Sequence, residues 1–158
     1  MHTEPPSGVF RLEREQEIPR EIHEVFAFFV RAENLEAITP PWLSFRILRQ
    51  STPEIVKGTL VEYQLKWRFV PLRWRTEIVE WEPPLRFVDV QVSGPYRLWH
   101  HRHEFAPRGR YTLMRDTVDY SLPGGMIGRL MHRLAIHRDI QAIFDYRARK
   151  IRGLFAHE

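Results

Sequence analysis

The strongest constraint in this sequence is a long proline-free segment that follows a strand-rich region. PGG at 123–125 interrupts the strands, and the chain then runs from about residue 126 to residue 155 without a proline. This predicts one long C-terminal helix. Between about residues 45 and 122, β-branched and aromatic runs separated by turn residues predict five or six antiparallel strands. One face of such a sheet needs a cover, and only the last helix is long enough to supply it.

The N-terminal part completes an α+β pattern. FRLEREQEI (10–18) alternates apolar and charged residues, which is typical of a half-buried strand. Residues 20–38 begin with helical spacing, Asn34 is placed to cap a second short helix, and TPP at 39–41 ends it. We therefore expect a helix-grip fold, in which a curved antiparallel sheet wraps around the long C-terminal helix and two short helices follow the first strand.

The later strands are separated by recognisable turn residues. We expect turns at Pro71, at EPPL, at SGP and at Arg108-Gly109. The expected strands are residues 45–50, 59–69, 72–81, 86–92, 97–105 and 111–122.

Length and composition exclude several classes of protein. The 158 residues suit one domain, which we expect over residues 9–156 after a disordered tail at 1–8. The absence of cysteine excludes disulfides, thiolate metal sites and cysteine nucleophiles. The polar N-terminus does not have the pattern of a signal peptide, and no apolar run is long enough for a membrane span, so we expect a cytoplasmic protein.

The charge pattern argues against a nucleic-acid partner. The net charge is 24 − 20 = +4, but arginines and acidic residues are interspersed, so few phosphates could be neutralised together. Arginines beside tryptophans near Pro71 suit either a phosphate contact or ordinary cation–π packing, and we expect the packing. These residues are Arg68, Arg73, Arg75, Trp67 and Trp74.

Four sequence motifs and the element order resemble the START/Bet v 1-like ligand-binding superfamily, also called SRPBCC, in its bacterial cyclase/dehydrase-like form. The motifs are ENLEAITPPWLSFRI (33–47), FVDVQVSGPYRLWHHRHEF (87–105), DTVDYSLPGG (116–125) and IFDYRARKI (143–151). The resemblance implies a deep cavity between sheet and C-terminal helix that takes a hydrophobic ligand, with no metal and no cofactor. It implies no shared catalytic residue, and the chain lacks the G-x-G-x-x-G fingerprint of dinucleotide-binding proteins.

The first candidate site lies on LWHHRHEF. Period-two alternation places Trp99, His101, His103 and Phe105 on one face of a strand. A turn at Arg108-Gly109 would pair His103 with Met114 and His101 with Asp116, and would add Tyr120 to the same, concave face. The His–Asp pair could be structural, could orient a ligand or could transfer protons. A metal site has only three evident ligands, and we expect none.

The second candidate is a polar pair on the long helix. Residues at 3–4 spacing form one stripe, which we expect to face the sheet, with His137 and Gln141 at its centre. The pair could be hydrogen-bonded within the core or could anchor a polar group of the ligand. The stripe consists of Leu130, Leu134, His137, Gln141, Phe144, Ala148, Ile151 and Phe155.

The third candidate is FVDVQV, in which Phe87, Asp89 and Gln91 share a face. Pointing inward, Asp89 and Gln91 would add an acceptor and an amide to the cavity, whereas pointing outward they would be solvated.

The favoured function is binding of a hydrophobic or aromatic small molecule, such as a lipid or polyketide. The alternative is an aromatase/cyclase or dehydratase in which His101 and Asp116 transfer protons. A third possibility is an interaction module that uses Ile136, Ile143 and Leu154, on the opposite side of the helix, to pack on a partner or a second copy. We expect a monomer or a homodimer.

Overall fold

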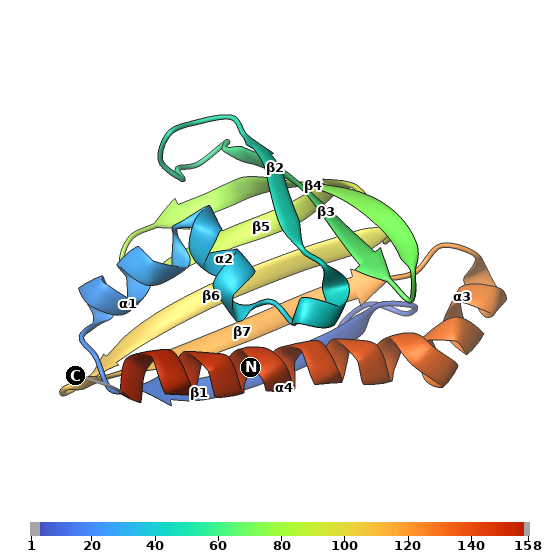
Figure 1. The fold of residues 1–158 in the computed structure, drawn as a ribbon. Helices are drawn as coiled ribbons and strands as arrows, with labels where there is room; N and C mark the ends of the chain where they lie inside the picture. The colour runs from blue at the N-terminus through green and yellow to red at the C-terminus, as the bar shows by residue number, and fades with distance from the viewer. Residues whose placement is uncertain (1–3, 157–158) are drawn as a thin grey trace.

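The computed structural model describes residues 4–156 and contains one seven-stranded antiparallel sheet around a C-terminal helix (Figure 1). The predicted helix-grip fold is confirmed. Residues 1–3 of the expected tail lie outside the described residues, and the division into a tail and one domain stays a prediction. The elements are β1 (Phe10–Ile18), α1 (Ile22–Phe29), α2 (Ala32–Ile38), η1 (Pro41–Leu43), β2 (Arg46–Gln50), β3 (Leu60–Trp67), β4 (Val70–Glu82), β5 (Arg86–Ser93), β6 (Leu98–Arg108), β7 (Tyr111–Ser121), α3 (Gly125–Met131), η2 (His132–Ile136) and α4 (His137–Ala156).

The sheet is a meander to which the first strand is added at one end. The order is β1-β7-β6-β5-β4-β3-β2, so β2 to β7 pair with their sequence neighbours and β1 pairs with β7. The β4–β5 register shifts between Ile78 and Glu80 and again between Arg75 and Thr76. Such bulges bend and twist a sheet, which helps this one to curve around α4 (Figure 1).

The β3–β4 hairpin turns at a different place from the one predicted. Arg68 and Phe69 form its two-residue loop, and both have positive φ, at 46° and 74°. Positive φ at both positions is the conformation of a type I′ turn, which matches the twist of a hairpin. Pro71 is therefore not the turn but the second residue of β4, opposite Lys66.

The β6–β7 hairpin is displaced from the predicted register by two residues. Gly109, at φ 63°, and Arg110 form its loop, and Arg108 pairs with Tyr111. His103 therefore faces Asp116, and His101 faces Val118. A two-residue displacement leaves each side chain on its predicted face, because the faces of a strand alternate with period two.

The C-terminal helix contains an irregular turn that changes which of its residues face the sheet. The helical backbone from Gly125 to Ala156 contains a π-helical turn, η2, between α3 and α4. A π turn closes i→i+5 hydrogen bonds and so adds a residue to the turn. As a result His132 is buried, whereas Leu134 is 66% exposed, and the first half of the predicted stripe is wrong. The second half is correct at Phe144, Ile151 and Phe155, which are all buried.

The buried apolar residues form two clusters on the concave side of the sheet. One cluster lies under α1 and α2 and includes Phe26, Phe105 and Ile151. The other lies where α4 crosses β1 and β7 and includes Tyr120 and Phe144. Within residues 4–156, no helix is both long enough and apolar enough to cross a membrane.

Candidate functional site

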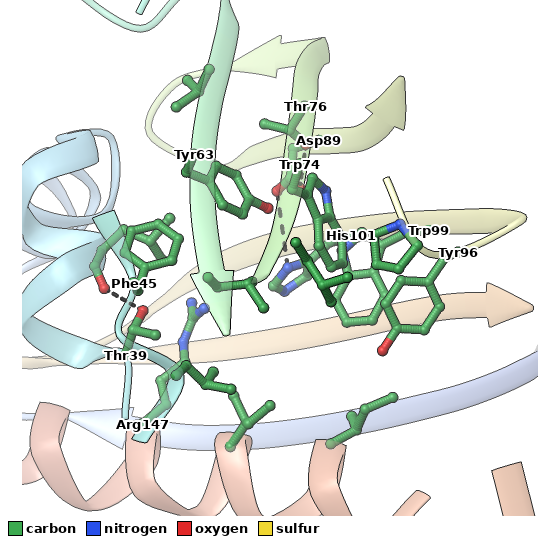
Figure 2. A pocket seen from close by; sticks show the side chains of 18 of the residues that line it. Thr39, Phe45, Tyr63, Trp74, Thr76, Asp89, Tyr96, Trp99, His101 and Arg147 are labelled. Atoms are coloured by element: carbon green, nitrogen blue, oxygen red, sulfur yellow. Dashed lines mark hydrogen bonds and ion pairs between the residues drawn. The ribbon is translucent and has the colours of Figure 1, made fainter. Parts of the chain in front are cut away.

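A cavity of about 540 Å³ lies between the concave face of the sheet and the C-terminal helix. Most of its lining is aliphatic or aromatic, and one cluster of buried polar groups lies on the strands beside it (Figure 2). Other polar residues of the lining include Arg31, Asn34, Thr39 and Asp139. The strands present alternate residues to it, so that Tyr63 and Leu65 of β3 line the cavity whereas Leu60 and Glu62 do not.

Aromatic side chains of four segments form one side of the cavity (Figure 2). Tyr63 and Trp74 are directly paired across β3 and β4, and their rings stack with centroids 5.7 Å apart. Trp74 also contacts Tyr96 and Trp99, each at 5.2 Å between ring centroids. Trp74, predicted to join a surface group with Arg68, is instead only 6% exposed. Tyr63 and Tyr96 were not predicted as site residues, although strand alternation from Trp67 places Tyr63 on the same face.

The polar cluster consists of Asp89, His101, His103, Asp116 and Arg147. His101 Nε2 lies 2.8 Å from Asp116 Oδ1, and His103 Nε2 lies 2.7 Å from Asp89 Oδ2. The two imidazole rings stack, with centroids 3.7 Å apart. His103 Nδ1 lies 3.3 Å from Asp116 Oδ1 but has no hydrogen-bond partner, because the geometry is unfavourable.

The pKa values of the two histidines shift in opposite directions, because burial dominates at His101 and the neighbouring carboxylates dominate at His103. Burial lowers the pKa of His101 to about 4, with a further contribution from His103 that the bond to Asp116 does not offset. Burial also acts to lower the pKa of His103, but Asp116 and Asp89 outweigh it and the pKa is raised. At neutral pH His101 is therefore a neutral imidazole. Because a carboxylate only accepts hydrogen bonds, its Nε2 carries the proton and its Nδ1 is an acceptor.

Both carboxyl groups of the cluster are held as carboxylates. Burial acts to raise the pKa of Asp116, but Arg147, His101 and His103 hold that pKa well below its usual value. Burial likewise acts to raise the pKa of Asp89, and the bond to His103 with the charge of His101 outweighs it. The cluster can therefore accept hydrogen bonds through its carboxylates and donate them through Arg147.

Four of the residues predicted from the sequence line the cavity, namely Asp89, Trp99, His101 and His103. Asp116 lies behind the histidines and is 6% exposed. The sequence predicts that His101 and Asp116 are directly opposite each other on β6 and β7. Asp116 is instead opposite His103, and its hydrogen bond to His101 runs diagonally between the strands. The face predicted for these residues is therefore right, and the pairing is wrong.

Three strand residues expected at the cavity do not line it. Phe105 packs in the cluster under α1. Tyr120 is buried, with its hydroxyl 2.7 Å from His132 Nε2. Gln91 shares the face of Asp89, but its side-chain amide is bonded to the backbone N–H and carbonyl of Tyr96. These three side chains therefore stabilise the fold through packing and hydrogen bonds within the protein.

The helical pair expected on the cavity does not line it either. His137 is exposed, and Gln141 accepts a hydrogen bond from Arg14 of β1. Ile136 and Ile143, expected on the opposite side of the helix, line the cavity instead. Of the three residues proposed for an interaction surface, only Leu154 is exposed, at 44%. The π turn and the proximity of β1 both changed which helix positions face inward.

Arg147 is a cavity residue that was not predicted from the sequence. It lies on α4 between Phe144 and Ile151, at the 3–4 spacing of the buried stripe, and is only 7% exposed. That spacing could have indicated its position, but a charged residue is seldom buried without a partner.

A metal ion is poorly accommodated by this geometry. Asp89, His101 and His103 have ligand atoms within 4.8 Å of one another. However, the two imidazoles lie face to face with 30° between their planes, so their in-plane lone pairs run side by side and do not converge on one point. The absence of a metal stays a prediction.

A family model for "Polyketide cyclase / dehydrase and lipid transport" matches residues 18–144. The chain belongs to this family. The resemblance to the SRPBCC superfamily is thereby confirmed. No curated protein matches the chain significantly.

Solved structures share the fold at low sequence identity. A protein from Thermus thermophilus is 18% identical with a TM-score of 0.63, covering 91% of this chain and 98% of its own. A START superfamily protein from Mycobacterium smegmatis is 12% identical with a TM-score of 0.68, covering 91% and 98%. The di-domain ARO/CYC protein StfQ from the steffimycin biosynthetic pathway is 11% identical with a TM-score of 0.72, covering 94% of this chain and 51% of its own.

Proposed function

We propose that this protein binds a hydrophobic or aromatic small molecule, such as a lipid or polyketide, in the cavity between the sheet and α4. The observation that carries the proposal is a largely apolar cavity of about 540 Å³ with a cluster of buried polar groups at its lining. Small-molecule sites typically have volumes of about 300–1,000 Å³, apolar linings and a few convergent polar groups. The family description, which names polyketide cyclases and lipid transport, supports the same ligand class.

Filling the cavity from within tests this proposal. Leu65 and Leu60 lie on the same strand, but only Leu65 lines the cavity. We expect Leu65→Trp to weaken binding of the neutral apolar dye Nile red by about tenfold or more, because the indole occupies the space of the dye. Leu60→Trp is the matched control and should leave dye binding unchanged. Binding that is absent in the wild type, or equal in both variants, would contradict a ligand site in this cavity.

A cyclase or dehydratase activity is the second candidate, and the place of His101 in the cavity beside Asp116 favours it. Neutral His101 lines the cavity, its Nε2 is held by Asp116, and its Nδ1 is therefore an available base. In such a reaction Nδ1 takes a proton from the carbon beside a ligand carbonyl, and the C–H electron pair becomes part of an enolate. Asp116 Oδ1, 2.8 Å from Nε2, partly offsets the cost of forming a buried imidazolium.

Deuterium exchange tests this proton transfer without knowledge of the natural ligand. We expect the wild type to accelerate uptake of deuterium from D2O into the α-carbon of 1-tetralone, measured by NMR. His101→Gln should abolish the acceleration while retaining Nile red binding, and His100→Gln, on the other face of β6, should have no effect. Equal exchange rates with wild type and His101→Gln would leave binding as the only proposal.

A further inference from the structure

Arg147 places a positive charge at the border between the polar cluster and the apolar lining of the cavity. Its side chain rises from α4 and its guanidinium points into the cavity (Figure 2). The guanidinium carbon lies 5.5 Å from the ring centre of Phe29 and 5.7 Å from that of Phe144. With only 7% of the residue exposed, little water can solvate this charge from outside the protein.

The hydrogen-bond donors of Arg147 are not used by the protein. Among residues 4–156 its guanidinium makes no hydrogen bond, and its buried Nε has no partner. The nearest carboxylate oxygen is Asp116 Oδ1, 3.5 Å from one terminal nitrogen, and this oxygen already accepts from His101 at 2.8 Å. A guanidinium has five N–H donors, and a buried cation is stable only when it is paired and hydrogen-bonded.

The neighbouring carboxylates do not fill this role. Asp116 Oδ1 is directed at His101, and Asp89 Oδ2 is directed at His103 at 2.7 Å. Asp116 therefore forms an ion pair with Arg147 at 3.5 Å without a hydrogen bond to it, and Asp89 is bonded to His103. Among residues 4–156 no side chain accepts a hydrogen bond from the guanidinium, so a bound molecule with an acceptor can fill this place.

We propose that the cavity takes an aromatic carboxylic acid whose carboxylate pairs with the guanidinium of Arg147. This proposal rests on the proposed ligand-binding function and specifies its ligand class. A planar guanidinium binds a carboxylate through two parallel hydrogen bonds, a geometry that other acceptors match less well. The aromatic part of the ligand fits the contacting rings of Tyr63, Trp74, Tyr96 and Trp99, which offer faces and edges to a flat ring system.

The arrangement also sets how the ligand lies. Phe144 contacts both Arg147 and His101, and Trp99 in turn contacts His101 at 6.5 Å between ring centroids. The acid group therefore lies near α4, the ring system lies toward β4 and β6, and the middle of the molecule passes the imidazole of His101.

A matched pair of probes separates charge recognition from apolar burial. 2-Naphthoic acid and 2-naphthamide have the same ring system and nearly the same size, but only the acid is charged at neutral pH. By calorimetry we expect the wild type to bind the acid at least about tenfold more tightly than the amide. Arg147→Met should remove this preference with little change for the amide, and Arg147→Lys should retain part of it. Arg149→Met, at an exposed position of α4, is the control for general charge effects and should behave as the wild type.

The results that overturn the proposal are distinct from those that overturn ligand binding itself. The proposal of an aromatic acid is refuted if the folded wild type binds the acid and the amide with equal affinity. It is also refuted if the wild type binds Nile red but neither naphthalene probe. In both cases the proposal of a ligand-binding cavity still stands. Failure of Nile red and both naphthalene probes would refute both proposals. The comparison of acid and amide in the wild type needs no variant, so it remains decisive even if Arg147→Met does not fold.

Discussion

The neutral state of His101 predicts that the protein loses stability as the pH falls below 6.5. An unfolded histidine has a pKa near the ordinary value of 6.5, whereas burial lowers the pKa of His101 to about 4. Between these two values the unfolded chain binds a proton that the folded protein excludes, so acidification favours unfolding. Integrated from about pH 7.5 to about pH 4.5, this difference corresponds to a loss of about 2 to 3 kcal/mol.

Other titratable groups also change the free energy of unfolding with pH, each in a direction set by its pKa shift. His132, whose pKa is lowered by burial and by His137, adds a loss in the same direction. His103 has a raised pKa, so its stabilising contribution is fully present below pH 6.5 and is lost only as the pH rises through its folded pKa. The lowered pKa values of Asp89 and Asp116 matter only below the ordinary aspartate value of 3.8. Within the window from 6.5 to 4, the histidines with lowered pKa therefore set the slope.

Urea unfolding followed by tryptophan fluorescence measures this slope. His101→Gln keeps an N–H donor for Asp116 but cannot be protonated, so its loss between the two pH values should be smaller than that of the wild type by about 2 to 3 kcal/mol. His100→Gln, on the opposite face of β6, is the control and should follow the wild type. If wild type and His101→Gln lose the same stability on acidification, His101 is not held neutral by burial and the argument fails.

Three further substitutions test the packing around the site by urea unfolding. Phe144→Ala should cost about 3 to 5 kcal/mol, because a buried ring between His101 and the helix is removed, and a cost under about 1 kcal/mol would contradict its place in the core. Gly128→Ala should destabilise by about 1 to 3 kcal/mol, since a Cβ there would lie 2.3 Å from a backbone carbonyl oxygen. Gly153→Ala on α4 meets open space and should stabilise by about 0.5 to 1 kcal/mol. Changes of the same sign in both variants would refute this explanation. Tyr120→Phe should cost about 1 to 3 kcal/mol by leaving buried His132 without its hydroxyl partner, and a neutral effect would show that this bond is not formed.

The strand faces were predictable from the sequence because they depend only on a period of two. His101 and His103 were placed correctly on the concave face even though the hairpin loop is Gly109-Arg110 and not Arg108-Gly109. Exact partners depend on which residues form the loop, and the glycine in a two-residue loop fits either position. The pairing was therefore the part that the sequence left undetermined.

The helix face was harder to predict because a helix can change its phase. The π turn at His132–Ile136 adds a residue that no spacing rule anticipates, and it turns Leu134 outward. Arg147 was missed for a different reason. Its spacing from Phe144 fits the buried stripe, but its charge is that of a surface residue, and the cavity and the nearby Asp116 carboxylate account for a guanidinium at this place.

The open sheet has two edge strands, β1 and β2, at which another copy of the chain could add a strand. Strands β1 and β2 each have one unpaired backbone edge, which in principle templates the addition of another strand and leads to aggregation. On β1 the exposed side chains between the apolar positions are glutamates, Glu13, Glu15 and Glu17. Strand β2 has only five residues, a register shift before Arg49 and exposed arginines. Two β1 edges would bring glutamates together and two β2 edges would bring arginines together, so like edges repel. A β1–β2 contact would join opposite charges, and there the short length and the register shift of β2 limit the strand that can be added.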